Sequence, residues 1–347
     1  MKIFVDFHHE GLFNSLQMLF EERLGHELYR PIGQDWFNEG YWMIAKPYGN
    51  ALSTVAQYLD IRDLHRPFIK NEIKSEETDH YVVKGAYKNH RAITLKQFKE
   101  MDIDIVIASY NDHISVYADL IKKYKPKAKL IHQMGNEWNV DFSTVKNLLA
   151  STLLFNVPNS VNAVFYHQEF DLNIYKYTPP QESKYVRSFV NCLNTQPHLK
   201  KDWQDFLELE NLASSLIFES YGATCKNGTL NRQLQIAEFM SGSKWGIHLK
   251  NGGDGYGHVI HGWAAVGRPL IYRGSQYKNK LAGELLVNYV TGIDLDLVDI
   301  MKVASEIIHI SQEQYLTMCQ NIHSHFKKTV DFDKEQKSIE NFLQNLR

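Results

Sequence analysis

The stretch Trp245-Gly246-Ile247-His248-Leu249-Lys250-Asn251-Gly252-Gly253-Asp254-Gly255-Tyr256-Gly257-His258 decides the fold of this chain. Its first six residues predict a strand, and residues 258–266 have helical character. Between the two stand four glycines within six residues, which permit positive φ and remove the side chains that keep a ligand away from the backbone. A helix N-terminus after such a loop favours an anion. We therefore expect residues 253–257 to contact a diphosphate; the alternative is a turn that only reverses the chain.

Short apolar runs alternate with helical patterns on both sides of this stretch, which is typical of βα units on a parallel sheet. In the first half, strands are predicted at residues 3–7, 103–108 and 128–132. In the second half, strands are predicted at residues 186–191, 215–219, 245–249, 270–272 and 285–290. Ligands of open α/β sheets bind beyond the carboxyl ends of the strands, so the polar residues that follow each strand are the candidate sites.

The length of 347 residues indicates two domains, because a single core seldom grows to that size. Two prolines and several polar residues interrupt the pattern at residues 177–183. We predict an N-terminal Rossmann-like domain over residues 1–178, a second one over residues 179–325 and a closing helix over residues 326–347. The closing helix carries its apolar residues on one face: Ile339, Phe342, Leu343 and Leu346.

Composition limits the classes of protein to consider. The 38 basic and 40 acidic residues create no overall field that would mark a polyanion-binding protein. Cys192, Cys225 and Cys319 are odd in number and far apart, which indicates thiols in a reducing compartment. No signal-peptide pattern opens the chain and no apolar run approaches the length of a membrane span. We expect a cytoplasmic protein without a transmembrane segment.

Residues 254–271 resemble the donor-site motif of GT-B glycosyltransferases related to family 4. In that family an acidic residue and Gly-Phe-Gly precede a helix, which ends at a Gly-x-Pro-hydrophobic strand entry. Asp254 matches the family's first glutamate, Tyr256 its aromatic residue and Gly257 its second glycine. The resemblance implies an α/β fold of two facing Rossmann-like domains with a C-terminal helix that crosses back. It also implies sugar transfer from a nucleotide-diphosphate sugar, as co-substrate, to an acceptor hydroxyl.

One position departs from the family. The second glutamate, about eight residues after the first, usually contacts the ribose or the sugar, and Gly262 stands there in this chain. His258 and His261 lie one helical turn apart on the same helix. We expect His258 to donate to a phosphate oxygen, and His261 to be a packed helix residue.

The donor-binding candidates follow from the glycine loop and from the family's use of an Arg or Lys to neutralise the leaving phosphates. They are Lys250, Gly252, Gly253, Asp254, Gly255, Tyr256, Gly257, His258 and Arg187. Replacement of Gly255 or Gly257 by valine is expected to weaken donor binding while the fold stays intact. No metal site is expected. Asp102 precedes an apolar strand and Asp104 lies inside it, and no other spacing of acidic or thiol residues suits a metal.

The loop after the first strand holds the catalytic candidates His8, His9 and Glu10. Inverting GT-B enzymes often carry a catalytic histidine in the equivalent loop, so the resemblance makes His8 or His9 a candidate general base for the acceptor hydroxyl. Relatives of family 4 retain configuration and use no such base, in which case the two histidines only shape the loop. The acceptor-binding candidates follow later strands: Asn111, Asp112, His113, Asn136 and Glu137.

Two other functions stay open. A sugar-nucleotide epimerase of the same architecture needs no separate acceptor. A catalytically silent sugar-nucleotide or glycan-binding module is favoured by Gly262 in place of the glutamate. For a transferase, the acceptor is a glycan, a lipid-linked sugar, a protein, a small molecule or a hydroxylated DNA base.

Overall fold

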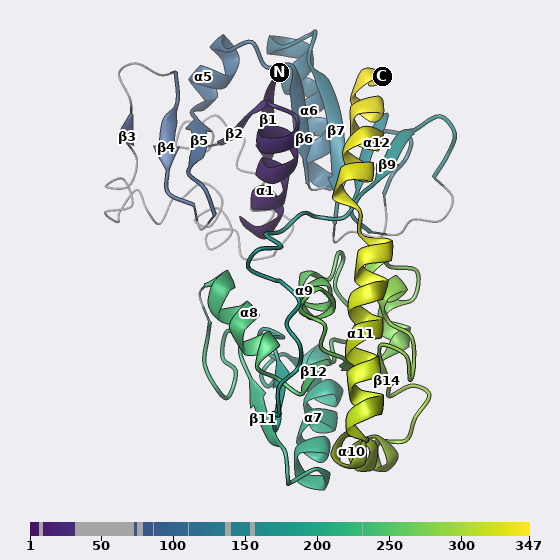
Figure 1. The fold of residues 1–347 in the computed structure, drawn as a ribbon. Helices are drawn as coiled ribbons and strands as arrows, with labels where there is room; N and C mark the ends of the chain where they lie inside the picture. The colour runs from purple at the N-terminus through teal and green to yellow at the C-terminus, as the bar shows by residue number, and fades with distance from the viewer. Residues whose placement is uncertain are drawn as a thin grey trace. The chain divides into compact units, whose positions relative to one another are not determined.

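A computed structural model describes residues 1–6, 10–31, 73–74, 79–85, 87–109, 111–135, 140–152, 157–230 and 232–347. The chain divides into two compact units. Unit 1 comprises Met1–Phe170 together with Phe332–Arg347, and unit 2 comprises Asp171–Asp331. Each unit is an α/β body on a sheet that is mainly or wholly parallel (Figure 1), so the predicted fold class is confirmed.

The described part of unit 1 contains one sheet with the strand order β3-β4-β5-β2-β1-β6-β7-β8-β9. The strands are β1 (Lys2–Asp6), β2 (Glu27–Pro31), β3 (Ile73–Lys74), β4 (Tyr81–Val83), β5 (His90–Ile93), β6 (Ile105–Ala108), β7 (Lys129–Met134), β8 (Asn147–Ala150) and β9 (Asn162–Phe165). The helices are α1 (Glu10–Leu16), η1 (Gln17–Arg23), α5 (Leu95–Glu100), α6 (Asn111–Tyr124) and α12 (Phe332–Gln344). The β3-β4 and β4-β5 pairs are antiparallel, and the other pairs are parallel.

Alternation along β1 produces the two layers of helices in unit 1. Ile3 and Val5 belong to a core that includes side chains from α1 and α12, whereas Phe4 belongs to the core formed with α5 and α6. Successive strand residues point to opposite faces, so one strand serves both cores. Each fully buried side chain of this size stabilises the unit by about 1.5–3 kcal/mol.

Helix α12 completes unit 1. Ile339 and Phe342 of its apolar face are buried in the core shared with α1. Asn162 Nδ2 on β9 donates to the carbonyl oxygen of Phe342 over 3.2 Å. Glu335 Oε2 accepts the backbone N–H of His167 over 2.8 Å. Helix α12 is therefore hydrogen-bonded to β9, at one edge of the sheet that contains β1.

Unit 2 contains a parallel sheet with the strand order β11-β10-β12-β13-β14. The strands are β10 (Tyr185–Ser188), β11 (Ile217–Ser220), β12 (Trp245–His248), β13 (Leu270–Tyr272) and β14 (Gly292–Asp294). The helices are η4 (Pro197–Leu199), α7 (Lys200–Leu212), α8 (Gln233–Ser241), α9 (His258–Val266), η5 (Gly274–Tyr277), η6 (Leu281–Leu285), α10 (Ile300–His309) and α11 (Gln312–Thr329). The chain leaves β10 for β11 on one side and later returns to β12 on the other. The order therefore reverses between β10 and β12, which is where ligands of such sheets bind.

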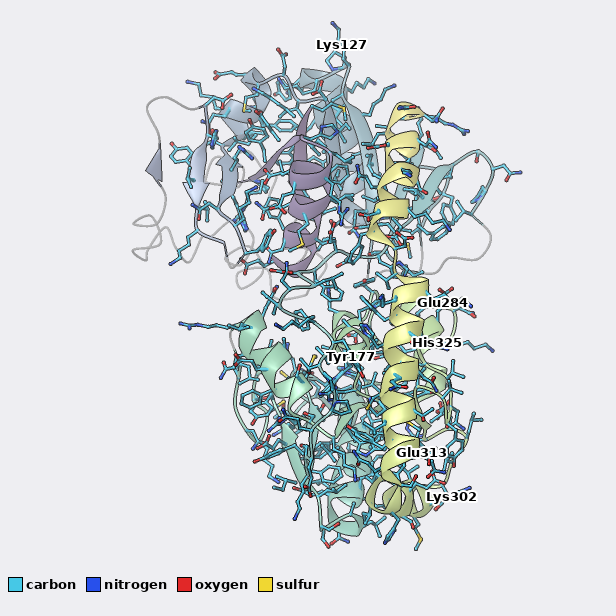
Figure 2. The ribbon with its side chains drawn as sticks, in the orientation of Figure 1. Lys127, Tyr177, Glu284, Lys302, Glu313 and His325 are labelled. Atoms are coloured by element: carbon cyan, nitrogen blue, oxygen red, sulfur yellow. The ribbon has the colours of Figure 1, made fainter. Side chains whose placement is uncertain are left out.

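Helix α9 packs directly on β12. Gly246 has no side chain, and a Cβ there would lie 2.6 Å from the indole of Trp263 on α9. Gly267 ends α9 with φ of +73° and lies against the ring of Tyr177. Tyr177, which Figure 2 labels, also stacks on His323 of α11 at 4.6 Å. These contacts fix the helix that follows the glycine loop.

The strand predicted at residues 285–290 is wrong. Leu281–Leu285 forms a 3-10 helix, and Thr291 donates its backbone N–H to the carbonyl oxygen of Val287 over 2.9 Å in a turn. Tyr289 has φ of +60°, which a strand does not allow. The edge strand β14 begins after this turn, at Gly292. Within the described residues, no helix combines the length and the apolar character needed to cross a membrane.

Candidate functional site

The glycine loop follows β12 at the switch point of unit 2. Gly252, Gly253 and Gly257 have φ of +82°, +65° and +83°, a region that glycine enters at little cost. A Cβ on Gly253 would overlap the carbonyl oxygen of Gln276, and one on Gly257 would lie 2.8 Å from Cβ of Ala282. Valine at position 257 would therefore strain the backbone, so its effect on donor binding would not be separate from an effect on the fold.

The N-terminus of α9 opens onto this loop. The helix begins at His258, and Gly257 is its N-cap residue, so no side chain caps the helix. The first N–H groups of a helix have no partner within the helix, and the dipole adds positive charge there. The helix start is therefore suited to an anion, as the order of strand, loop and helix predicts.

Asp254 organises the cationic side chains beside the loop. Its carboxylate accepts hydrogen bonds from His248 Nε2 over 2.8 Å and from Tyr277 OH over 3.3 Å, and it forms an ion pair with Lys250 Nζ. Burial disfavours the charged carboxylate, but the bond from His248 and the charges of His248 and Lys250 outweigh burial and hold the pKa of Asp254 far below its usual range. The negative charge of Asp254 thus balances the cationic side chains beside the glycine loop.

Lys280 is a part of the site that the sequence did not reveal. It lies between η5 and η6, is only 5% exposed, and donates from Nζ to the carbonyl oxygen of Gly252 over 2.7 Å. Burial lowers the pKa of Lys280 to about 8; the charge of Asp254 opposes this effect and that of Lys250 adds to it. A bound diphosphate would favour the charged ammonium.

Two side chains anchor the start of the loop. Asp202 of α7 accepts the backbone N–H of Asn251 over 2.6 Å and the side-chain amide of Gln276 over 3.0 Å. Gln276 in turn accepts the backbone N–H of Lys250 over 2.8 Å. Asp202 is almost fully buried, so this arrangement fixes the path of the chain as it leaves β12.

Tyr256 and Arg187, two further donor candidates, also make contacts within the protein. Tyr256 is buried and its ring stacks on His261 at 4.1 Å, while His258 meets the same ring edge-on at 4.8 Å. Arg187 donates to Glu219 Oε2 over 2.6 Å and to the carbonyl oxygen of Phe239 over 2.8 Å. In this structure both side chains hold the loop and the sheet together.

The position at which the family has its second glutamate is buried in this chain. Gly262 lies on the buried part of α9, where a Cβ would meet Met240 Sδ and Tyr175 Cε1 at 3.2 Å. A side chain at this position would require Met240 and Tyr175 to move. Gly262 is therefore packed against Met240 and Tyr175, and it supplies no side chain to a ribose.

The acceptor candidate His113 lies in the core of unit 1. Its ring is fully buried, and its Nδ1 lies 2.5 Å from Asp6 Oδ2 at the end of β1. Tyr117 of α6 is buried in the same place, where burial first and then Asp6 raise the pKa of its hydroxyl. This cluster joins β1 to α6 at the point where the strand order of unit 1 reverses.

The other described candidates of unit 1 stand at the starts of helices. Glu10 is the exposed first residue of α1. Asn111 and Asp112 form the first turn of α6, where the structure describes only their backbone. Four candidates lie outside the described residues: His8, His9, Asn136 and Glu137.

A buried polar cluster at the ends of β7 and β8 also went unpredicted. Ser151 Oγ accepts the side-chain amides of Gln133 over 3.2 Å and of Gln168 over 2.6 Å. A Cβ on Gly135 would lie 3.2 to 3.4 Å from these three groups. Their spacing in the sequence carries no motif, because three separate segments supply them. In the portions of the chain that the structure describes, no three His, Cys, Asp or Glu side chains are grouped to hold a metal ion.

Comparison with known proteins gives matches to solved structures. No family model matches the chain, and no curated protein sequence matches it. A glycosyltransferase from Rickettsia africae ESF-5 is 12% identical over 99% of this chain and 97% of its own, with a TM-score of 0.64.

Two further glycosyltransferase-fold structures agree over nearly the whole chain. HepE of Anabaena, solved with UDP and glucose, is 11% identical over 99% of both chains with a TM-score of 0.63. TarM of S. aureus, solved with UDP among its ligands, is 10% identical over 98% of this chain and 99% of its own, with a TM-score of 0.57. The likeness establishes the fold, and this chain has the GT-B fold.

Proposed function

We propose that this chain is a glycosyltransferase, which takes a hexose or pentose from a nucleotide-diphosphate sugar and transfers it to an acceptor hydroxyl. The observation that carries the proposal is the glycine loop at the β10/β12 switch point, with the open N-terminus of α9 and the ammonium groups of Lys250 and Lys280 beside it. Structures of the same fold that are bound to UDP support this assignment.

The proposed chemistry requires stabilisation of the leaving group. As the bond between the anomeric carbon and the diphosphate oxygen breaks, negative charge grows on the diphosphate. The N–H groups that begin α9 and the charged form of Lys280 are preorganised to stabilise that charge. In this proposal the enzyme needs no metal and no bound cofactor.

The acceptor hydroxyl must lose a proton during transfer. We propose unit 1 as the acceptor side, with His8 or His9 as the base of an inverting reaction. In a retaining reaction the leaving phosphate takes the proton instead. We place the enzyme in the cytoplasm; its acceptor is a glycan, a small molecule or a hydroxylated DNA base.

A thermal-shift screen of nucleotide sugars tests donor binding, because a ligand that binds only the folded state raises the unfolding temperature. The selected donor, labelled in its sugar, then distinguishes the functions. Label on an acceptor supports a transferase, and label on a nucleotide with a changed sugar identifies an epimerase. Donor that binds and returns unchanged with every acceptor class would indicate a binding module and overturn the proposal.

A further inference from the structure

His248 is the last residue of β12 and lies almost fully buried at the base of the glycine loop. Its Nε2 is 2.8 Å from Asp254 Oδ2. Asp254 keeps its negative charge despite burial, because His248 and Lys250 hold the pKa of this carboxyl group far below its usual range. An ionised carboxylate only accepts hydrogen bonds, so Nε2 of His248 carries a proton and donates to Asp254.

The bond between His248 and Asp254 closes the glycine loop. His248 ends β12, and Asp254 stands three residues before Gly257, the N-cap of α9. Lys280 bonds to the carbonyl oxygen of Gly252 and fixes the middle of the loop. The bond from His248 fixes the later part, which leads into α9, and the N–H groups that begin this helix are suited to an anion.

Tyr277 of η5 connects the same pair to Lys280. Its hydroxyl donates to Asp254 Oδ2 over 3.3 Å, and its ring centroid lies 5.9 Å from that of His248. Lys280 Nζ lies 5.6 Å from the centroid of the same Tyr277 ring. Tyr277 and Lys280 are also almost fully buried. Because protein interiors are close-packed, the position of His248 affects both the carboxylate and the buried ammonium.

Exposure separates the two basic partners of Asp254. The side chain of Lys250 is 35% exposed, whereas that of His248 is 1% exposed. Exposed ion pairs hold their partners weakly, because water competes and long side chains lose entropy. A buried, charge-assisted hydrogen bond is stronger and more directional. His248 is therefore the partner that fixes the orientation of the Asp254 carboxylate.

We propose that His248 is a positioning residue of the donor site, which acts through Asp254 to hold the approach to α9 in the geometry that binds a diphosphate. The role rests on the proposed function, because it concerns the same site. In this role His248 does not touch the donor. Its Nε2 is bonded to Asp254, and the donor meets the backbone of the loop and the start of the helix.

Two measurements on the full chain test the proposal. Titration calorimetry with UDP measures donor binding, and hydrogen–deuterium exchange of the backbone amides of residues 251–258, without ligand, measures the loop itself. His248→Leu should lower the affinity for UDP and speed exchange in the loop, each by at least about tenfold, because the bond to Asp254 is lost. His248→Gln should restore both values, since the glutamine amide donates from the position of Nε2.

A double-mutant cycle distinguishes a role through Asp254 from simple packing. In Asp254→Ala the acceptor of the bond is already absent. Addition of His248→Leu should then change exchange in the loop by no more than about twofold. A packing role would preserve the full effect in that background. Thermal unfolding shows which variants fold. If His248→Leu does not fold, His248→Asn takes its place, because its amide is one carbon shorter than that of glutamine.

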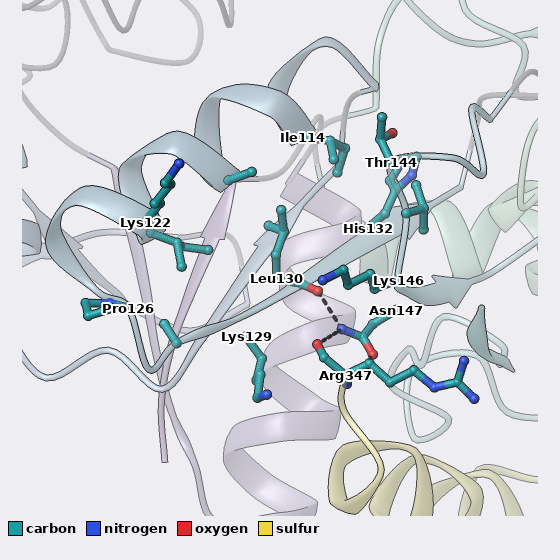
Figure 3. Close-up of a pocket in the computed structure, with 14 residues that line it drawn as sticks. Ile114, Lys122, Pro126, Lys129, Leu130, His132, Thr144, Lys146, Asn147 and Arg347 are labelled. Carbon is teal, nitrogen blue, oxygen red and sulfur yellow. Dashed lines mark hydrogen bonds between the residues drawn. The ribbon is translucent and has the colours of Figure 1, made fainter. Parts of the chain in front are cut away.

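His132→Leu is the matched control. His132 of β7 is also a buried strand histidine, and it lies beside a cavity of unit 1 (Figure 3). Within the described residues, neither of its ring nitrogens has a hydrogen-bond partner, so the same substitution removes no bond. It should leave the affinity for UDP and exchange in the glycine loop unchanged.

Equal results for His248→Leu and His132→Leu would overturn the proposal. A loss that His248→Gln shares, or that persists in the Asp254→Ala background, would overturn it as well. Failure of UDP to bind the unmodified chain would instead count against the proposed donor. The exchange measurements need no ligand, so they decide in that case whether His248 holds the loop.

Discussion

Lys280 Nζ donates a 2.7 Å hydrogen bond to the carbonyl oxygen of Gly252, and so connects the segment between η5 and η6 to the glycine loop. The two residues are 28 positions apart in the chain, and the bond holds a buried ammonium next to the N-terminus of α9.

Replacement of Lys280 by methionine should weaken the binding of the nucleoside diphosphate by about tenfold, because one charge-assisted bond is lost. Calorimetry with the diphosphate chosen by the thermal-shift screen measures the change. Lys278→Met is the control, because Lys278 is exposed two residues earlier. Equal affinity in the two variants would remove Lys280 from the donor site.

The affinity for the same diphosphate should decline as the pH rises through about 8. Burial lowers the pKa of Lys280 to about 8, so the ammonium that the diphosphate favours is present below this pH and is lost above it. Titrations between pH 6.5 and 9.5 measure the effect. In Lys280→Met the curve should be flatter over this range, and an unchanged slope would assign the titration to another group.

Replacement of Asp202 by asparagine should destabilise the start of the glycine loop. The buried carboxylate accepts the Asn251 N–H and the Gln276 amide, and an uncharged acceptor weakens both bonds. We expect the free energy of unfolding to fall by about 1–3 kcal/mol and the affinity for the donor to fall as well. Urea denaturation and calorimetry measure the two effects. Glu208→Gln on the exposed side of α7 is the control and should change neither.

Alanine at Gly252 and Gly253 should separate backbone strain from steric overlap. Both residues have positive φ, and a non-glycine residue in that conformation costs about 1–2 kcal/mol. A Cβ on Gly252 meets no atom within 4 Å, whereas one on Gly253 overlaps the carbonyl oxygen of Gln276. Urea denaturation should therefore show a larger loss for Gly253→Ala, and equal losses would contradict this packing.

Local patterns in the sequence predicted the α/β class and the strand, loop and helix around the glycines, because alternation and glycine content are local properties. Lys280 could not be predicted, because its contact with Gly252 depends on how the segment after β13 folds back. The buried position of His113 could not be predicted from the sequence either. A polar residue after a strand is typical of a loop. The ring of His113 is instead buried in the core, beside Asp6 of the neighbouring strand β1.

Unit 1 takes its residues from both ends of the chain, and this sets the order in which the protein is built. Phe332–Arg347 are synthesised after all of unit 2, and they include Ile339 and Phe342, which belong to the core around β1. Domains synthesised first usually fold first. Here the unit that is begun first cannot complete its core until α12 has been made. Unit 2 is continuous in the sequence and has no such requirement.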